Sequence, residues 1–193
     1  MQAVIDFILE IDRLKAVTRK IKPLGLDRYE NPAEHSWQIA VLAASLAPYA
    51  PAGAALDHVI EMLLVHDIGE IDTGDTLTFT EGGWVERKQA ELQAAKRIFG
   101  LLPVRQGEHF LALWQEFENG ETPAARFANA VDRAMPVLLN LANGGQSWRE
   151  NEISYERVVR RIEPPISAGC PALWEYLKTR LDSARVDGLF GGD

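Results

Sequence analysis

The sequence predicts an all-helical protein, a bundle of roughly eight helices. Apolar residues recur at intervals of three and four along most of the chain, which is the spacing of one face of an α-helix. No stretch alternates apolar and polar residues convincingly with the period of two that is typical of a β-strand. Glycine, proline and asparagine punctuate the chain between the periodic segments, where they end one helix or begin the next. We expect helices over residues 3–17, 31–47, 57–68, 85–99, 104–118, 122–142, 154–162 and 171–184.

Apolar periodicity predicts the first helix, and a capping signal predicts where the second helix begins. Apolar residues on one face mark residues 3–17 as an amphipathic helix. Residues 20–30 contain a proline and a glycine and are expected to form a loop. Asn31 followed by Pro32 is a cap with proline in the first turn, so the second helix begins there and ends before Pro48.

The next two helices flank a segment that we expect to be a loop. Asp57 is expected to cap the third helix, which ends near Ile68. Residues 69–83 are rich in glycine and threonine and are interpreted as a loop. A helix over residues 85–99 follows and ends at Gly100.

Caps and prolines also define the helices of the second half. Thr122 and Ser154 stand at helix starts as capping residues, and Pro171 opens the last helix. Pro136 lies inside the helix 122–142 and is expected to kink it, because proline removes a backbone donor. The tail 188–193 is expected to fray.

Composition is that of an ordinary soluble globular protein. The 193 residues suit one domain, residues 1–193, of which 47% are hydrophobic and 25% charged. The single cysteine, Cys170, excludes an internal disulfide framework and fits a reducing compartment. No apolar run approaches the roughly 20 residues that a membrane span needs, and the N-terminus lacks the basic start of a signal peptide. We therefore expect a cytoplasmic protein that does not enter a membrane.

The distribution of charge is more informative than the net charge of −8, which argues against nucleic-acid binding. Six basic residues lie between Arg13 and Arg28, and the next one is Arg87. The gap holds ten acidic residues, four of them within Asp67–Asp75, directly after an apolar run. Carboxylates clustered and partly buried without a cation are costly. The cluster therefore lies in water or binds a metal.

Two histidines and two aspartates form the candidate metal site. His35 falls one turn into the second helix, His66 and Asp67 close the third, and Asp132 lies mid-helix on a largely apolar background. Helical bundles build metal sites from facing helices, so ligands far apart in sequence are expected. Two imidazoles with two carboxylates suit one divalent ion of Mn, Fe, Co, Ni or Zn better than Mg or Ca.

Each of these residues also has a simpler explanation. A histidine such as His35 is often a hydrogen-bonded core residue, and Asp132 could be a solvated polar residue. Glu70 and Asp75 could be ordinary loop acids. Asp67 at a helix C-terminus faces the negative end of the helix dipole, which costs about 0.3–1 kcal/mol without compensation. The combination, rather than any single residue, favours a metal centre.

The combined motifs resemble the HD-domain hydrolases, and within them the branch of bacterial 5′-deoxynucleotidases and their eukaryotic HD-domain relatives. The matching motifs are Arg13-Leu14-Lys15 with Arg19, Asn31-Pro32-Ala33-Glu34-His35-Ser36, His66-Asp67 with Glu70, Thr73-Gly74-Asp75, and Asp132. The resemblance covers a motif-bearing core of about residues 13–141, and helices over 142–193 complete the HD-domain helical bundle.

The resemblance implies a role for each motif. His35, His66, Asp67 and Asp132 would hold one divalent ion. Arg19 would bind the substrate phosphate, Glu70 would orient or deprotonate the attacking water, and Asp75 would serve the leaving group. Proteins of this branch tend to form homodimers, so a homodimer is expected here too.

Two further residues are candidates for substrate binding. In the characterised deoxynucleotidase of this branch, a tryptophan after the phosphate-binding arginine helps exclude the ribose 2′-hydroxyl. Lys20 stands at that position, which leaves deoxyribose selectivity open and makes Lys20 a candidate phosphate contact. Trp37 could stack on a base, although packing in the core is the commoner role for such a tryptophan.

The favoured function is hydrolysis of nucleoside 5′-monophosphates to nucleoside and phosphate. Two alternatives use the same ligands: hydrolysis of phosphodiesters or guanosine polyphosphates, and a metal-containing nucleotide sensor without turnover. Glu70 and Asp75 argue against the sensor, because a purely structural site has less need of them. The native metal, the base and sugar preference, the pathway and any contribution of a dimer partner to the site stay open.

Overall fold

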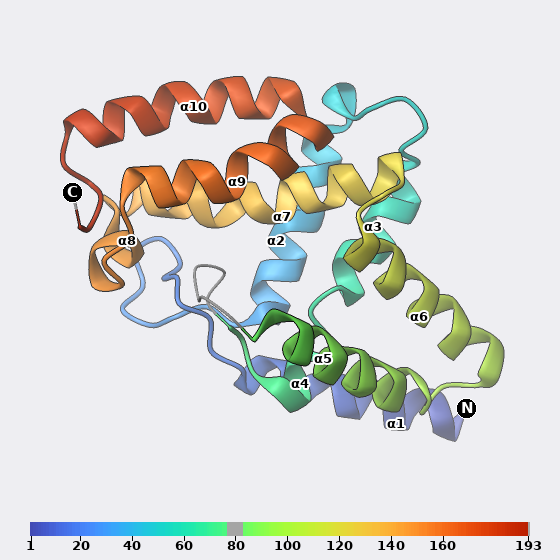
Figure 1. The fold of residues 1–193 in the computed structure, drawn as a ribbon. Helices are drawn as coiled ribbons and strands as arrows, with labels where there is room; N and C mark the ends of the chain where they lie inside the picture. Colours follow the sequence, from blue (N-terminus) through green and yellow to red (C-terminus); the bar gives the residue numbers. More distant parts are fainter. Residues whose placement is uncertain (77–82, 193) are drawn as a thin grey trace.

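The computed structural model describes residues 1–76 and 83–192 of the chain, and over these ranges it is helical and contains no strand (Figure 1). Within them, eight α-helices have ten or more residues, which confirms the predicted fold class. They are α1 (Gln2–Ile11), α2 (Pro32–Ser45), α3 (Leu56–Val65), α5 (Trp84–Phe99), α6 (Val104–Asn119), α7 (Pro123–Ala142), α9 (Tyr155–Gly169) and α10 (Pro171–Val186). None of the described helices is long and apolar enough to cross a membrane.

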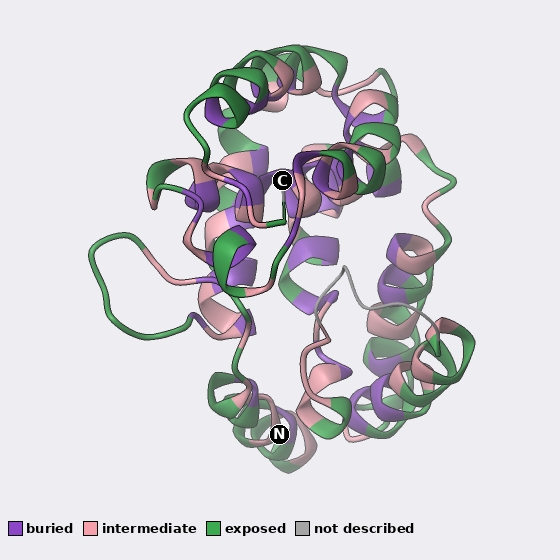
Figure 2. Cartoon of the chain, turned by 60° about the vertical axis from the view of Figure 1, so that its left-hand side comes forward, coloured by how far each residue is buried: buried purple, intermediate pink, exposed green. Residues whose placement is uncertain are grey.

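Helix α7 is the centre of the fold. It packs against α2, α3, α6, α9 and α10, and twelve of its twenty residues are buried. Figure 2 shows the buried faces of the helices turned toward the interior and the exposed faces outward. Gly169 ends α9 so close to α7 that an added Cβ would lie 2.0 Å from the Arg126 carbonyl oxygen, so glycine is required there. The middle of α7 therefore lies deep in the protein.

Two short helices and one boundary differ from the predictions. Residues 70–73 form the one-turn helix α4 (Glu70–Thr73), although this segment was expected to be a loop. Buried Ile68 anchors the chain just before α4, and Gly74 ends it with a φ of 73°. Helix α8 (Gln146–Glu150) was not predicted. Asp57 does not cap α3, because the helix already begins at Leu56 and Ala55 occupies the cap position.

The ends of two other helices also differ. The first predicted helix splits into α1 and a 3₁₀ turn over Asp12–Ala16. Helix α9 continues past its predicted end at Ile162 to Gly169, although Pro164 and Pro165 lie inside it. Ile166 is fully buried there, so its packing in the core stabilises a turn that prolines alone would disfavour.

The C-terminal tail was expected to fray, and its described residues 188–192 instead pack on the fold. Phe190 is buried, stacks on Trp148 with ring centres 4.5 Å apart, and meets Tyr155 edge-on. The Gly191 backbone N–H donates to the Ile153 carbonyl at 3.1 Å. An isolated phenylalanine among glycines gives no periodic signal, so the prediction missed this tertiary contact.

We predict that Phe190→Ala lowers the free energy of unfolding by about 3 kcal/mol, because it removes a buried ring and leaves a cavity. Urea denaturation followed by circular dichroism measures the change. Val186→Ala is the control, since Val186 is 89% exposed and its truncation should cost less than about 0.5 kcal/mol. Equal effects of the two substitutions would show that the tail does not contribute to the core.

Candidate metal centre

Three side chains from three helices converge in the interior. His35 comes from the first turns of α2, His66 follows α3, and Asp132 lies in the middle of α7. Their potential ligand atoms all lie within 4.8 Å of one another. His35 Nε2 is 2.9 Å from Asp132 Oδ1, and His66 Nε2 is 3.7 Å from the same oxygen. The structure thus gathers three of the four residues predicted as metal ligands.

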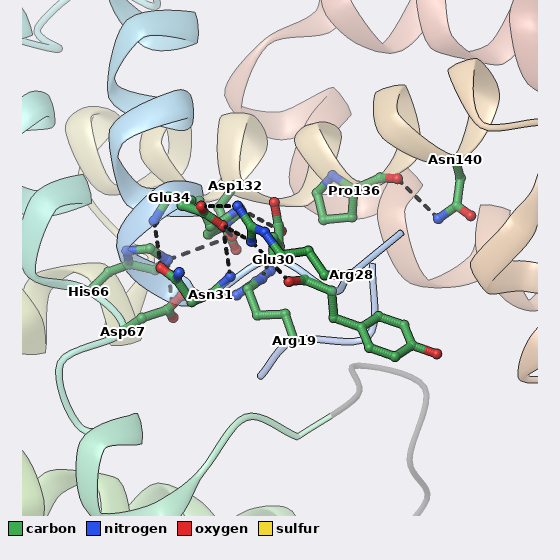
Figure 3. A network of polar contacts seen from close by, with 12 residues as sticks. Arg19, Arg28, Glu30, Asn31, Glu34, His66, Asp67, Asp132, Pro136 and Asn140 are labelled. Carbon is green, nitrogen blue, oxygen red and sulfur yellow. Dashed lines mark hydrogen bonds and ion pairs between the residues drawn. The ribbon is translucent and has the colours of Figure 1, made fainter. Parts of the chain in front are cut away.

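The start of α2 fixes the position of His35. Asn31 Oδ1 accepts a hydrogen bond from the Glu34 backbone N–H at 3.0 Å, and Glu34 Oε2 accepts one from the Asn31 N–H at 3.2 Å. This capping box, visible in Figure 3, together with Pro32, defines where the helix begins. His35 then shares the buried face with Ile39, one helical turn further on.

The hydrogen bonds of His66 provide a test of whether a metal fits. Its Nδ1 lies 2.8 Å from the Leu63 carbonyl oxygen. A carbonyl only accepts, so Nδ1 carries the hydrogen and the Nε2 lone pair faces the centre. Nε2 is buried without a hydrogen-bond partner among the described residues, and it lies 3.1 Å from Asp67 Oδ1. A lone pair facing carboxylate oxygens requires a cation between them, so the donor set fits a divalent metal.

The electrostatics of the two imidazoles agree with this test. Burial lowers the pKa of His35 to about 4, and nearby Arg19 acts in the same direction, so this ring is neutral at pH 7. Burial also acts to lower the pKa of His66, but the Asp67 and Asp132 carboxylates outweigh it and raise the pKa to about 10. The carboxylates therefore draw a positive charge, a proton or a metal ion, to His66 Nε2.

Asp67, the fourth predicted ligand, lies at the edge of the centre. Its Oδ1 faces His66, while its Oδ2 accepts a hydrogen bond from Arg19 Nη1 at 3.0 Å (Figure 3). One carboxylate therefore joins the candidate metal centre to the predicted phosphate-binding arginine. Burial acts to lower the pKa of Arg19, but surrounding carboxylates, Asp67 foremost, raise it above its usual value, so the guanidinium stays charged.

Glu30 is a component of the site that the sequence did not reveal. It is only 2% exposed, and its Oε1 accepts a hydrogen bond from Arg19 Nε at 3.0 Å. The same oxygen lies 3.7 Å from His35 Nδ1, and the Arg19 backbone N–H donates to the Glu30 carbonyl. Glu30 thus holds Arg19 and lies beside the His35 ring. A lone glutamate at the end of a predicted loop gives no signal of such a role.

Glu70 and Asp75 lie beside the centre, on the wall of a cavity of about 320 Å³ that Arg19 also lines. Burial raises the pKa of Glu70 to about 10, and the Asp67 and Asp75 carboxylates add to the rise. Burial likewise raises the pKa of Asp75, to which Glu70 is hydrogen-bonded. The two acids therefore form a hydrogen-bonded pair that holds a proton at neutral pH.

The two remaining predicted residues differ in position. Lys20 lines a smaller pocket of about 80 Å³, next to Arg19 and Asp75. Trp37 is 66% exposed and is not among the described residues that line either cavity, so the expected core packing is wrong. Each helical residue turns by about 100°, so a side chain two positions after His35 points away from the interior.

Comparison with known proteins identifies the fold. A family model described as "HD domain" matches residues 11–174. The chain belongs to the HD-domain family. The converging His35, the His66-Asp67 pair and Asp132 are the residues on which the sequence resemblance to this family rests.

Named relatives of this HD-domain protein include 5′-deoxynucleotidases. The human 5′-deoxynucleotidase HDDC2 is 25% identical over 138 residues, which cover 71% of this chain and 66% of the human protein. The 5′-deoxynucleotidase PM0747 of Pasteurella multocida is 26% identical over 164 residues, covering 80% of this chain and 84% of that protein. The matches thus span about two thirds of the human relative and most of the bacterial one.

Solved structures show the same fold. A crystal structure described as a predicted metal-dependent phosphohydrolase from Magnetospirillum magnetotacticum is 40% identical with a TM-score of 0.93, covering 98% of this chain and 97% of that one. A protein from Pyrococcus horikoshii, at 22% identity and a TM-score of 0.63, covers 93% of this chain and 97% of its own. The second likeness concerns the fold alone.

We predict that His66→Ala abolishes retention of a divalent metal through desalting, because Nε2 is the unpartnered donor at the centre. Elemental analysis of the purified protein measures the metal. His58→Ala is a matched control, since His58 belongs to α3 but pairs with Glu116 at 2.7 Å on a partly exposed surface. Metal retained equally by both variants would place the ion elsewhere.

We also predict that Glu30→Gln weakens metal affinity by about 10–100-fold, the range found when outer partners of metal-binding histidines are altered. Isothermal titration with Mn²⁺ or Co²⁺ measures the affinity, and circular dichroism verifies the fold. Glu156→Gln is the control, because Glu156 is exposed and pairs with Arg185 at 2.6 Å, away from the centre. An unchanged affinity for Glu30→Gln would remove Glu30 from the support of His35.

Proposed function

We propose that this HD-domain protein is a metal-dependent phosphohydrolase that converts nucleoside 5′-monophosphates to nucleoside and phosphate. The observation that carries the proposal is the link between the cluster of His35, His66 and Asp132 and the Arg19 guanidinium through Asp67. A cation site and a fixed arginine at one cavity suit a phosphate ester. The 5′-deoxynucleotidases and the metal-dependent phosphohydrolase among the relatives support this reaction class.

The donor set limits the metal. A divalent ion held by His35, His66, Asp132 and Asp67 would supply positive charge to the phosphate oxygens and lower the pKa of a water molecule. Imidazole nitrogens with carboxylate oxygens favour Mn, Fe, Co, Ni or Zn over Mg. The homodimer and the cytoplasmic location stay predictions from the sequence.

Arg19 is the residue proposed to bind the phosphate group. Its guanidinium has five N–H donors, and the described contacts use Nε with Glu30 and Nη1 with Asp67. The remaining donors can bind phosphate oxygens in a fixed orientation, because the two carboxylates hold the guanidinium plane. Lys20, which lines the adjoining pocket, adds a second positive charge on this side.

Glu70 and Asp75 are proposed to move the protons. A water oxygen forms a bond to phosphorus, the bond from phosphorus to the nucleoside 5′-oxygen breaks, and the water proton passes to the Glu70–Asp75 pair, in which one carboxylate is free to accept it. Asp75 gives a proton to the departing 5′-oxygen, so nucleoside and phosphate leave with all protons accounted for. A hydrogen-bonded acid pair suits this exchange, because one member can accept a proton while the other donates.

The experiment measures phosphate release by chelated protein after addition of Mn, Co, Fe, Zn or Mg, with ribo- and deoxyribonucleoside 5′-monophosphates. We expect release only with metal, and the deoxy-to-ribo ratio reports how Lys20 affects the choice of sugar. Release solely from phosphodiesters or guanosine polyphosphates would move the function to those substrates. Tight nucleotide binding without release of phosphate by the metal-loaded protein would indicate a sensor.

A further inference from the structure

The side of the cavity that α7 and α9 form carries two arginines that the proposed reaction does not use. Arg133 follows Asp132 on α7, and Arg161 lies on α9, which packs along α7. Both side chains line the cavity of about 320 Å³ next to the metal centre. Arg133 Nε is 3.6 Å from Asp132 Oδ2, so the first of the two arginines lies directly beside the candidate metal centre.

Arg161 is held at the cavity by an aromatic ring rather than by an acid. Its guanidinium carbon lies 5.1 Å from the centre of the Trp84 ring, which also lines the cavity. Among residues 1–76 and 83–192, no side chain or carbonyl forms a hydrogen bond or ion pair with Arg161. The ring contact fixes the guanidinium while leaving its N–H donors for another partner.

Three of the acids that line this cavity have other partners. Asp67 pairs with Arg19 at 3.0 Å, Glu118 pairs with Lys88 at 3.1 Å, and Asp132 belongs to the metal centre. Toward α7 and α9 the cavity presents Arg133 and Arg161, while Asp67 and Glu70 line it from the chain that follows α3. Arg133 and Arg161 line the same cavity, and burial and the like charge of Arg133 both lower the pKa of Arg161. Two neighbouring guanidiniums suit a doubly charged anion.

We propose that Arg161, together with Arg133, binds a second phosphate group of the substrate. This inference rests on the proposed function and extends its substrate class to nucleotides that carry two phosphates. Either a nucleoside 3′,5′-bisphosphate or a nucleoside 5′-diphosphate would supply this second phosphate group. Water would release the phosphate at the metal centre in either case, leaving a nucleoside 3′-phosphate or a nucleoside 5′-monophosphate.

The test compares kcat/KM of the metal-loaded protein for a nucleoside 5′-monophosphate, its 3′,5′-bisphosphate and its 5′-diphosphate. We expect Arg161→Gln to reduce kcat/KM for one of the two-phosphate substrates at least about tenfold more than for the monophosphate, as the loss of a charged hydrogen bond predicts. The substrate that shows this loss identifies the position of the second phosphate. Arg160→Gln is the matched control, since Arg160 is the neighbour of Arg161 on α9 and is not among the described residues that line the cavity.

Equal effects of Arg161→Gln on all three substrates, or none, would overturn the proposal. The proposed function fails independently of this proposal if the wild-type protein releases phosphate from none of the three nucleotides with any metal. In that case calorimetric titration of the metal-loaded protein with the same nucleotides still decides the proposal. It stands if Arg161→Gln weakens binding of a two-phosphate nucleotide about tenfold more than binding of the monophosphate, and it falls if the two losses are equal.

Discussion

The buried carboxylate of Asp132 is the constraint on which the rest of the structure depends. It lies in the middle of the central helix α7, 7% exposed, with His35 hydrogen-bonded to it and His66 beside it. An ionised carboxylate removed from water costs several kcal/mol unless a cation compensates. The fold therefore brings two imidazoles from α2 and α3 to the same point, and the packing of three helices and the chemistry of the centre have one cause.

The surrounding residues extend this charge balance outward. Asp67 connects the centre to Arg19, and Glu30 connects Arg19 back to His35. Arg19 forms buried ion pairs with both Glu30 and Asp67. Displacement of any one of these three side chains therefore leaves a buried charge without its partner. This coupling orients Arg19 in advance, which is what phosphate recognition by a rigid guanidinium requires.

Local signals predicted most of the fold, and contacts between distant segments account for the errors. The helix starts at Asn31-Pro32 and at Thr122, whose side chain accepts from the Ala125 N–H at 3.0 Å, are local signals and were found in the sequence. Phe190 and the extension of α9 depend on partners far away in the chain, so periodicity could not reveal them. The same division holds at the site, where motifs located His35, His66 and Asp132 but gave no sign of Glu30.

An acidic protein with a proposed anionic substrate needs an explanation in local terms. The net charge of −8 disfavours a nucleotide at long range, but charges are screened over about 8 Å at physiological salt. The cavity lining therefore decides, and there the acids Asp67, Glu70, Asp75 and Asp132 face the arginines Arg19, Arg133 and Arg161. At the candidate metal centre itself, the carboxylates of Asp67 and Asp132 lie beside the neutral ring of His35. A divalent cation there would offset these carboxylates and favour a phosphate group beside Arg19, so binding of the cation and binding of the phosphate would be coupled by electrostatics.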